Sequence, residues 1–236
     1  MMSMAILAAQ QNLGSVLVAL LPLMIGAAVV PIPIIIVLLL LSNQGGLLKG
    51  AAFVGGAIAV RLAQGVVFGY IFASDPAATS ETGGSLIVST LLLVVGVLML
   101  ITAFRKWNKE EDPDGPPPRW MAALGGLSAP KAFGMGAALV AISAKQWVFT
   151  LSAIGVIGQA QLGPPASTAL FLCYALAVQA LGLIAVIAYA MAPRSAGPAL
   201  VQASEWLERN DRQIMVAFSL IFGLFFLFKG IAGLAG

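Results

Sequence analysis

The sequence predicts an all-α integral membrane protein with six transmembrane helices, on three observations. The chain of 236 residues is 60% hydrophobic and only 9% charged, whereas a soluble domain carries about 25% charged residues. Six apolar runs, most of them about long enough to cross a hydrocarbon core of about 30 Å, take up most of its length. All nine acidic residues lie outside these runs. We therefore expect a single transmembrane domain over residues 1–236, with runs at 13–41, 50–72, 86–104, 134–158, 168–191 and 214–228.

The first run carries a predicted helix break. Residues 13–41 form 29 residues without a charge, which as one straight helix would extend about 43 Å, more than the membrane core requires. Pro31 and Pro33 lie within it. Each proline removes a backbone donor and clashes with the preceding helical turn, so we expect a hinge or strong kink at these two residues.

Two cations lie near the centres of apolar runs, Arg61 in the second and Lys145 in the fourth. A charge at that depth costs roughly 2.5–3.5 kcal/mol on insertion scales and usually faces a cavity or a partner. Because no Asp or Glu lies inside any run, the pattern predicts that both cations bind an anionic group from outside the chain. The neighbouring polar residues are candidate ligands of the same substrate-binding site: Ser143, Gln146, Gln64 and Gln179.

A structural interpretation of these residues stays open. Backbone carbonyls of a kinked helix could satisfy Lys145, and Gln179 or carbonyls across the repeat interface could satisfy Arg61. The other polar side chains would then be interhelical hydrogen bonds, worth about 0.6–2 kcal/mol each.

The loop charges predict the orientation of the chain. The loops after the first, third and fifth runs carry nine Lys and Arg residues, and the loops after the second and fourth carry none. The positive-inside rule therefore places the basic loops in the cytoplasm and both termini outside. We expect an amphipathic helix over 198–210, a short interfacial helix near 118–127, and anchoring roles at the interface for three tryptophans, Trp107, Trp120 and Trp206.

The two halves of the chain show a weak internal repeat. Residues 25–42 match 135–152 at seven of eighteen positions with an offset of 110 residues, and a second pairing sets Arg61 opposite Gln179. Two Ala- and Val-rich helices can match to this degree by chance, which is the alternative. Three spans in each half would make the second copy run in the opposite sense, as in many transporters with a site at the midplane. We therefore expect two inverted three-helix repeats, at about 13–104 and 132–234, joined by a cytoplasmic loop over 105–131.

The composition excludes several kinds of chemistry. The chain has one cysteine, Cys173, and no histidine, so we expect neither a disulfide framework nor a Cys/His metal site within it, and no cofactor. An acyl or phosphoryl transferase is the least favoured function, because the runs hold no His, no Cys pair and no acid to act as a base. The net charge of +3 reflects basic cytoplasmic loops, and we do not interpret it as nucleic-acid binding.

Several of these features occur in a characteristic order along the chain: Pro31 and Pro33, Trp107, Arg119-Trp120-Met121, Lys131-Ala132-Phe133-Gly134, Lys145, Trp206-Leu207 and Asn210. In this order they resemble the lysine-exporter superfamily, and more closely its branch of glycolipid- and sulfolipid-addressing membrane proteins. The family has an Asn-Pro-Lys-Asn-like tetrapeptide in the fourth span. Here it reads Ser143-Ala144-Lys145-Gln146. The lysine matches, and the amide of Gln146 stands where the motif has its last asparagine. The proline that would break the helix is missing.

The resemblance implies export or surface delivery of a lipid or small molecule across the bacterial inner membrane. We therefore expect a multi-pass transporter that moves an anionic lipid or a small anionic or amphipathic molecule by alternating access. The alternative is an accessory membrane protein that transports nothing itself and assists a lipid-synthesis or lipid-export machinery. It would contact that machinery through 198–210 and 105–120. Membrane lipids are expected partners in both cases, and a homo-oligomer stays open.

Overall fold

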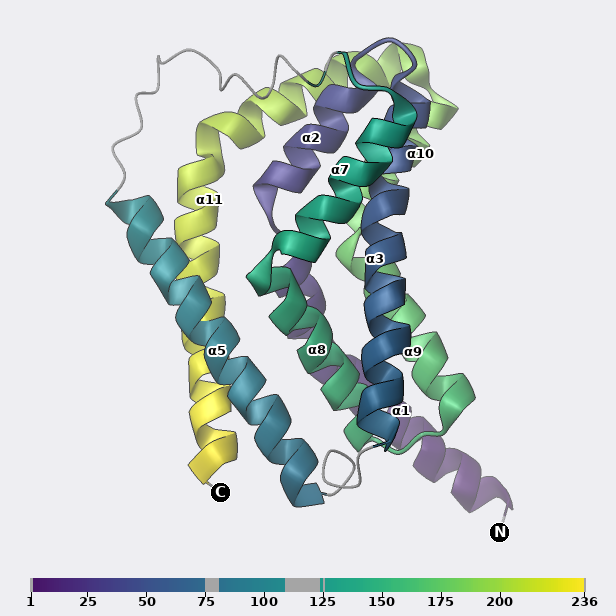
Figure 1. Cartoon of the computed structure of the whole chain (residues 1–236), viewed down its shortest axis with the longest axis vertical. Helices are drawn as coiled ribbons and strands as arrows, with labels where there is room; N and C mark the ends of the chain where they lie inside the picture. The colour runs from purple at the N-terminus through teal and green to yellow at the C-terminus, as the bar shows by residue number, and fades with distance from the viewer. Residues whose placement is uncertain (1, 75–80, 109–123, 125, 236) are drawn as a thin grey trace.

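The computed structural model describes residues 2–74, 81–108, 124 and 126–235, and every regular element in these ranges is a helix (Figure 1). Three helices are each long and apolar enough to cross a membrane. Three pairs pass the same test together but are bent by more than 40° at a short break, so the described chain has six spans if each bent pair is one span. The helices are α1 (Met2–Ala28), α2 (Pro31–Leu41), α3 (Gly46–Ser74), α5 (Glu81–Trp107), α7 (Ala129–Ile142), α8 (Ala144–Gln159), α9 (Pro164–Val178), α10 (Ala180–Met191) and α11 (Pro193–Ala235).

The predicted break in the first run is confirmed. The chain bends by 60° between α1 and α2, and Pro31 and Pro33 lie in the first turn of α2. Val30 has an extended conformation, with φ −115° and ψ 111°. A proline sterically disfavours the helical conformation of the residue before it, and it is tolerated in a first helical turn because its missing N–H has no helical partner there. Pro31 and Pro33 therefore explain both why α1 ends and why α2 starts here.

Two further breaks have no proline to cause them, and our sequence analysis did not predict them. Helices α7 and α8 meet at 73°, and α9 and α10 meet at 67°. The first break lies at Ser143, which has φ −75° and ψ 104° and accepts a hydrogen bond from the backbone N–H of Gln146. Serine favours this capping position because its side chain satisfies an N–H that has no partner within the helix. The second break lies at Gln179, whose side chain makes no capping hydrogen bond.

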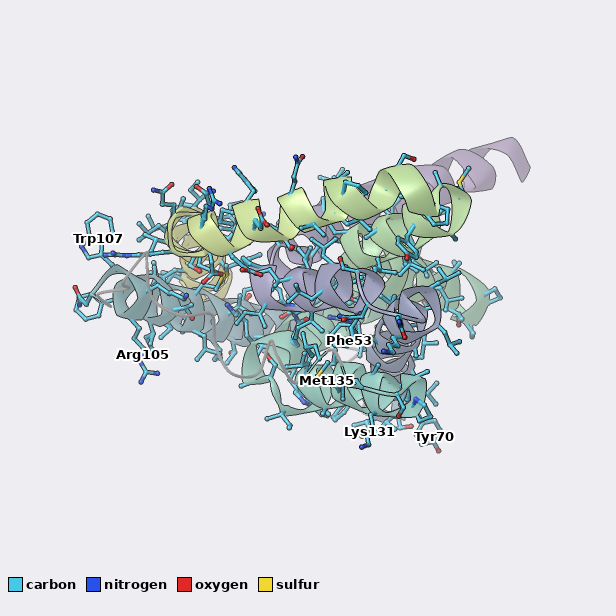
Figure 2. The ribbon with its side chains drawn as sticks, turned by 90° about the horizontal axis from the view of Figure 1, so that it is seen from above. Phe53, Tyr70, Arg105, Trp107, Lys131 and Met135 are labelled. Carbon is cyan, nitrogen blue, oxygen red and sulfur yellow. The ribbon has the colours of Figure 1, made fainter. Side chains whose placement is uncertain are left out.

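The chain termini lie at one end of the bundle, and the α2–α3 and α10–α11 connections lie at the other (Figure 1). Figure 2 is seen from that second end and shows Arg105 and Lys131 pointing away from the bundle while Phe53 lies inside it. The structure thus gathers these predicted cytoplasmic positions at one end. Its orientation in the membrane and the inverted repeat stay predictions.

The predicted amphipathic helix over 198–210 is not a separate element. It is the first part of α11, which crosses the end of the bundle and then turns down beside α5 (Figure 1). Leu200, Ala203 and Leu207 pack against a buried cluster, as their helical spacing indicates. Trp206 does not, and 59% of it is exposed. The predicted short helix near 118–127, with Trp120, falls mainly outside the described residues.

Glycines allow α3 and α7 to approach closely. A Cβ atom added at Gly136 would overlap the carbonyl of Phe53, and one added at Gly56 would overlap the carbonyl of Phe133. Small residues at helix crossings let backbones pack at this distance in membrane proteins. The crossing fixes the N-terminal half of α3 against the middle of α7, about two helical turns before the break at Ser143.

The outer surface of the bundle is apolar. Val66, Phe228 and Ile142 are 75%, 74% and 82% exposed. A large apolar exterior is unusual for a protein in water and is the surface expected against lipid. Helices can lie in lipid because their backbone N–H and C=O groups bond to one another within each helix. The chain is therefore a multi-pass membrane protein by its helix composition.

Candidate functional site

Arg61 is the centre of the candidate site. It lies near the middle of α3 and is only 1% exposed. Its Nη2 donates a hydrogen bond to Oε1 of Gln146 at 2.7 Å. Its Nε and Nη1 are buried and have no hydrogen-bond partner within the described chain. The guanidinium is thus a buried cation with only part of its hydrogen-bonding capacity used.

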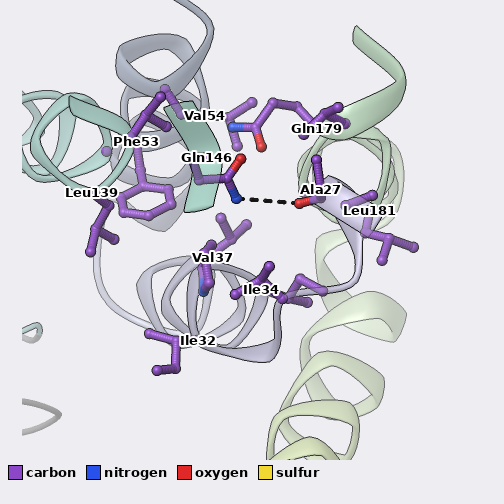
Figure 3. A pocket seen from close by; sticks show the side chains of 18 of the residues that line it. Ala27, Ile32, Ile34, Val37, Phe53, Val54, Leu139, Gln146, Gln179 and Leu181 are labelled. Carbon is purple, nitrogen blue, oxygen red and sulfur yellow. Dashed lines mark hydrogen bonds between the residues drawn. The ribbon is translucent and has the colours of Figure 1, made fainter. Parts of the chain in front are cut away.

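Gln146 connects Arg61 to two other helices. It is the third residue of α8, and its Nε2 donates to the carbonyl oxygen of Ala27 in α1 at 3.3 Å (Figure 3). The amide has one orientation in which it both accepts from Arg61 and donates to Ala27, and this is the orientation present. Thr150, one turn further along α8, donates to the carbonyl oxygen of Gln146 at 2.9 Å. Helices α1, α3 and α8 are therefore joined by one polar network.

A cavity of about 210 Å³ lies beside this network (Figure 3). All three helix breaks contribute to its wall, since Val30, Ser143 and Gln179 line it. Among the described residues of the wall, Arg61 is the only charged one. The other lining residues are Ala27, Ala28, Ile32, Pro33, Ile34, Val37, Phe53, Val54, Ala57, Gly136, Leu139, Val140, Gln146, Val178, Leu181 and Gly182.

Helices α2, α8 and α10 have their N-termini at this cavity. The first N–H groups of a helix have no intrahelical partner, and the helix dipole adds partial positive charge there. No side-chain cap is present at the start of α2 or of α10. The C-termini of α1, α7 and α9 end at the same breaks, so the helix ends carry partial charges of both signs there. The net positive charge of the described wall therefore comes from Arg61, which favours a bound anion.

The structure brings together most of the predicted site residues. Ser143, Gln146 and Gln179 line the cavity with Arg61, and so does Pro33. Pro31 is buried at the start of α2 but lies outside the wall. Gln64, one turn after Arg61, is also outside the wall; it is 4% exposed, and both its amide atoms lack a partner in the described residues.

Lys145 differs from Arg61. It is the second residue of α8 and is partly exposed, and it is not among the residues that line the cavity. It makes no hydrogen bond or ion pair with the described residues. The predicted convergence of two cations on one anion is therefore not part of this arrangement, and the binding role of Lys145 stays a prediction.

Sequence reasoning missed one polar residue beside the site, Tyr174 of α9. It is fully buried, and its hydroxyl has no hydrogen-bond partner among the described groups. It lies within electrostatic reach of Arg61 and next to Thr150. Val178, one turn further along α9, lines the cavity, but this neighbour is known only from the fold and gave the sequence analysis no signal. Tyrosine is common at membrane interfaces, and its burial at mid-bundle depends on the tertiary packing.

The described helices define a multi-pass membrane protein whose broken helices meet at a buried arginine. Among the described residues, no group of His, Cys, Asp and Glu could hold a metal ion. A family model described as Sap, sulfolipid-1-addressing protein, matches residues 20–232, so the chain belongs to this family. This match confirms the resemblance found in the sequence. Searches of the curated proteins and of the solved structures found no match.

Proposed function

We propose that the protein is an exporter that moves an anionic lipid or small anionic amphiphile across the bacterial inner membrane. Arg61 would bind the anionic group in the cavity. One observation carries the proposal: a buried guanidinium with two unpartnered nitrogens lies in the wall of a cavity that has no acidic residue among its described lining. The family description names a sulfolipid, and a sulfated lipid is a substrate of the proposed kind.

The energetic argument starts from the cost of the charge. An ionised side chain inside a membrane protein is costly unless it is paired, and no carboxylate of the described chain is placed to pair with Arg61. A bound oxyanion would supply the missing partner. Each hydrogen bond from a guanidinium N–H to a sulfate, phosphate or carboxylate oxygen is charge-assisted and roughly twice as strong as a neutral one, which adds to the charge attraction.

Alternating access would use the helix breaks as hinges. The break before Pro31 and the break at Ser143 occupy similar places in the two predicted inverted repeats, which supports the repeat. Transporters of this plan bind substrate at the midplane, between discontinuous helices, while the halves rock around it. Lys145, next to Gln146 in the chain, would add positive potential near the site. The positive-inside rule places both termini outside in this proposal.

The test is lipid movement by purified protein in phosphatidylcholine liposomes. An NBD-labelled sulfatide is the probe, and NBD-labelled galactosylceramide, which lacks only the sulfate, is the control. Dithionite reduces the label in the outer leaflet and so reports transbilayer movement. We expect the wild type to move the sulfated lipid faster than the uncharged one. Loss of a charge-assisted hydrogen bond is worth about 1.5–3 kcal/mol, so Arg61→Gln should lower the rate by about ten- to a hundredfold.

Arg209→Gln is the matched control, because this arginine is exposed and lies outside the cavity wall. It should leave the rate unchanged. Equal rates for wild type and Arg61→Gln would contradict the proposal. A folded wild type that moves neither lipid would favour the accessory function, in which a separate machinery transports the lipid.

A further inference from the structure

Unpartnered polar atoms continue beyond the cavity. Gln64 and Tyr174 are 4% and 0% exposed, and neither lines the cavity. Both amide atoms of Gln64, the hydroxyl of Tyr174, and Nε and Nη1 of Arg61 lack partners among the described groups. More than nine in ten buried polar groups are normally hydrogen-bonded, so a group of unpaired atoms at one level of a fold points to a missing ligand.

These groups lie one helical turn from the cavity, in the same direction on three helices. Gln64 follows Arg61 by three residues on α3, and Thr150 follows Gln146 by four on α8. Tyr174 precedes the cavity residue Val178 by four on α9. Helices α3 and α8 run toward the end that carries the termini, and α9 starts from that end (Figure 1). Each residue is therefore displaced by about 4.5–6 Å toward the termini.

Contacts between the helices bring these groups together. Tyr174 lies close enough to Arg61 and to the hydroxyl of Thr150 for an electrostatic interaction, although its own hydroxyl makes no hydrogen bond of normal geometry with either. At the next residue of α3, a Cβ atom added at Gly65 would overlap the ring of Phe171, and that ring lies 5.9 Å from the ring of Tyr174. Helices α3 and α9 thus touch at Gly65, and Arg61 and Gln64, three residues apart, lie on neighbouring positions of one face of α3.

The chemistry of the group is rich in donors. Arg61 offers N–H groups on Nε and Nη1, Gln64 offers an amide NH₂, and Tyr174 offers a hydroxyl. The only unpaired acceptor among them besides the hydroxyl itself is Oε1 of Gln64. A cluster with one positive charge and several free donors suits an oxyanion such as sulfate, phosphate or carboxylate.

We infer that Gln64, Tyr174 and the free nitrogens of Arg61 form a second oxyanion-binding station, one turn from the cavity toward the termini. This inference rests on the proposed function and adds a step to it. The anionic group passes from the cavity to the second station without leaving the guanidinium, because Arg61 contacts it at both. The second station is closed in this structure, so its occupation marks an occluded stage of transport.

The experiment removes one oxygen atom, by Tyr174→Phe. Two quantities are measured on the purified protein: the dissociation constant for decyl sulfate in maltoside micelles, and the transbilayer rate of NBD-sulfatide in phosphatidylcholine liposomes. We expect at least about a tenfold lower rate, with a dissociation constant within about threefold of wild type, because the cavity wall is intact. Gln64→Met, close in shape and without a hydrogen-bond donor, should give the same pattern and replaces Tyr174→Phe if that variant does not fold.

Ser219→Ala is the matched control. Ser219, on α11, is 1% exposed, and its hydroxyl also has no partner within the described chain, but it is not in the cavity wall. Its removal should leave both quantities unchanged. A wild-type rate in folded Tyr174→Phe or Gln64→Met would overturn the second station and leave the proposed function standing. A wild-type rate in Arg61→Gln, or a wild type that moves no sulfatide, would overturn both.

Discussion

A double substitution, Arg61→Met with Gln146→Leu, should make the protein more stable while abolishing anion binding. The reason is that the guanidinium is buried, with two nitrogens unpartnered among the described residues. A charge retained for a ligand is a cost to the empty fold. Removing both hydrogen-bond partners together avoids leaving one of them unpaired.

The expected gain follows from the contacts. An arginine at the centre of a membrane helix costs about 2.5–3.5 kcal/mol, which the double variant recovers. The carbonyl of Ala27 loses the donor that Gln146 supplies, at a cost of about 1 kcal/mol. The net stabilisation is about 2 kcal/mol. Arg61→Met alone leaves Oε1 of Gln146 unpaired, so its gain should be smaller, about 1 kcal/mol.

The assay is thermal unfolding in dodecyl maltoside, followed by tryptophan fluorescence. A stabilisation of about 2 kcal/mol corresponds to a rise in Tm of about 4–8 °C for a chain of this size. The double variant should also show no stabilisation by added decyl sulfate, whereas a bound ligand raises the Tm of the wild type. A fall in Tm of several degrees for the double variant would refute the reasoning, because it would show that Arg61 holds the helices together.

Three further predictions concern packing, the second cation and orientation. Gly136→Val should lower the free energy of unfolding by about 1–3 kcal/mol or more, because the new side chain would overlap α3. The control is Gly69→Ala, at a glycine with open space around it. Equal Tm values for Gly136→Val and the wild type would contradict the close α3–α7 crossing. Lys145→Gln should weaken decyl sulfate binding less than the arginine variant does, since this lysine is outside the cavity wall; a larger loss would assign it the main contact. In a cysteine-free background, membrane-impermeant maleimide should label Gln161→Cys in intact cells and Gln44→Cys only after permeabilisation; the reverse pattern would invert the orientation.

The sequence predicted the one break that prolines cause. Pro31 and Pro33 act on their own residues and neighbours, so the α1–α2 break could be found without knowing the fold. The cap at Ser143 is also local, but a lone serine in an apolar run occurs often without ending a helix. The break at Gln179 has no cap and no proline. It depends on how α9 and α10 pack against the rest of the bundle, which the sequence pattern does not contain.

The same distinction applies to the site. The absence of acidic residues from the apolar runs indicated that Arg61 lacked a charged partner, and the described cavity wall agrees. The hydrogen bond between Arg61 and Gln146 joins residues 85 positions apart, and the repeat alignment had set Arg61 opposite Gln179 instead. The different placement of Arg61 and Lys145 depends on the direction in which α8 leaves the break, a tertiary property.

The most direct measurement is an experimental structure of the protein in nanodiscs that contain sulfatide. We predict density for the sulfate within about 3 Å of Nε or Nη1 of Arg61, with the lipid chain leading away from the cavity. A structure that shows sulfatide ordered elsewhere on the protein, with both nitrogens hydrogen-bonded to water or main chain, would contradict the assignment of Arg61 as the anion-binding residue.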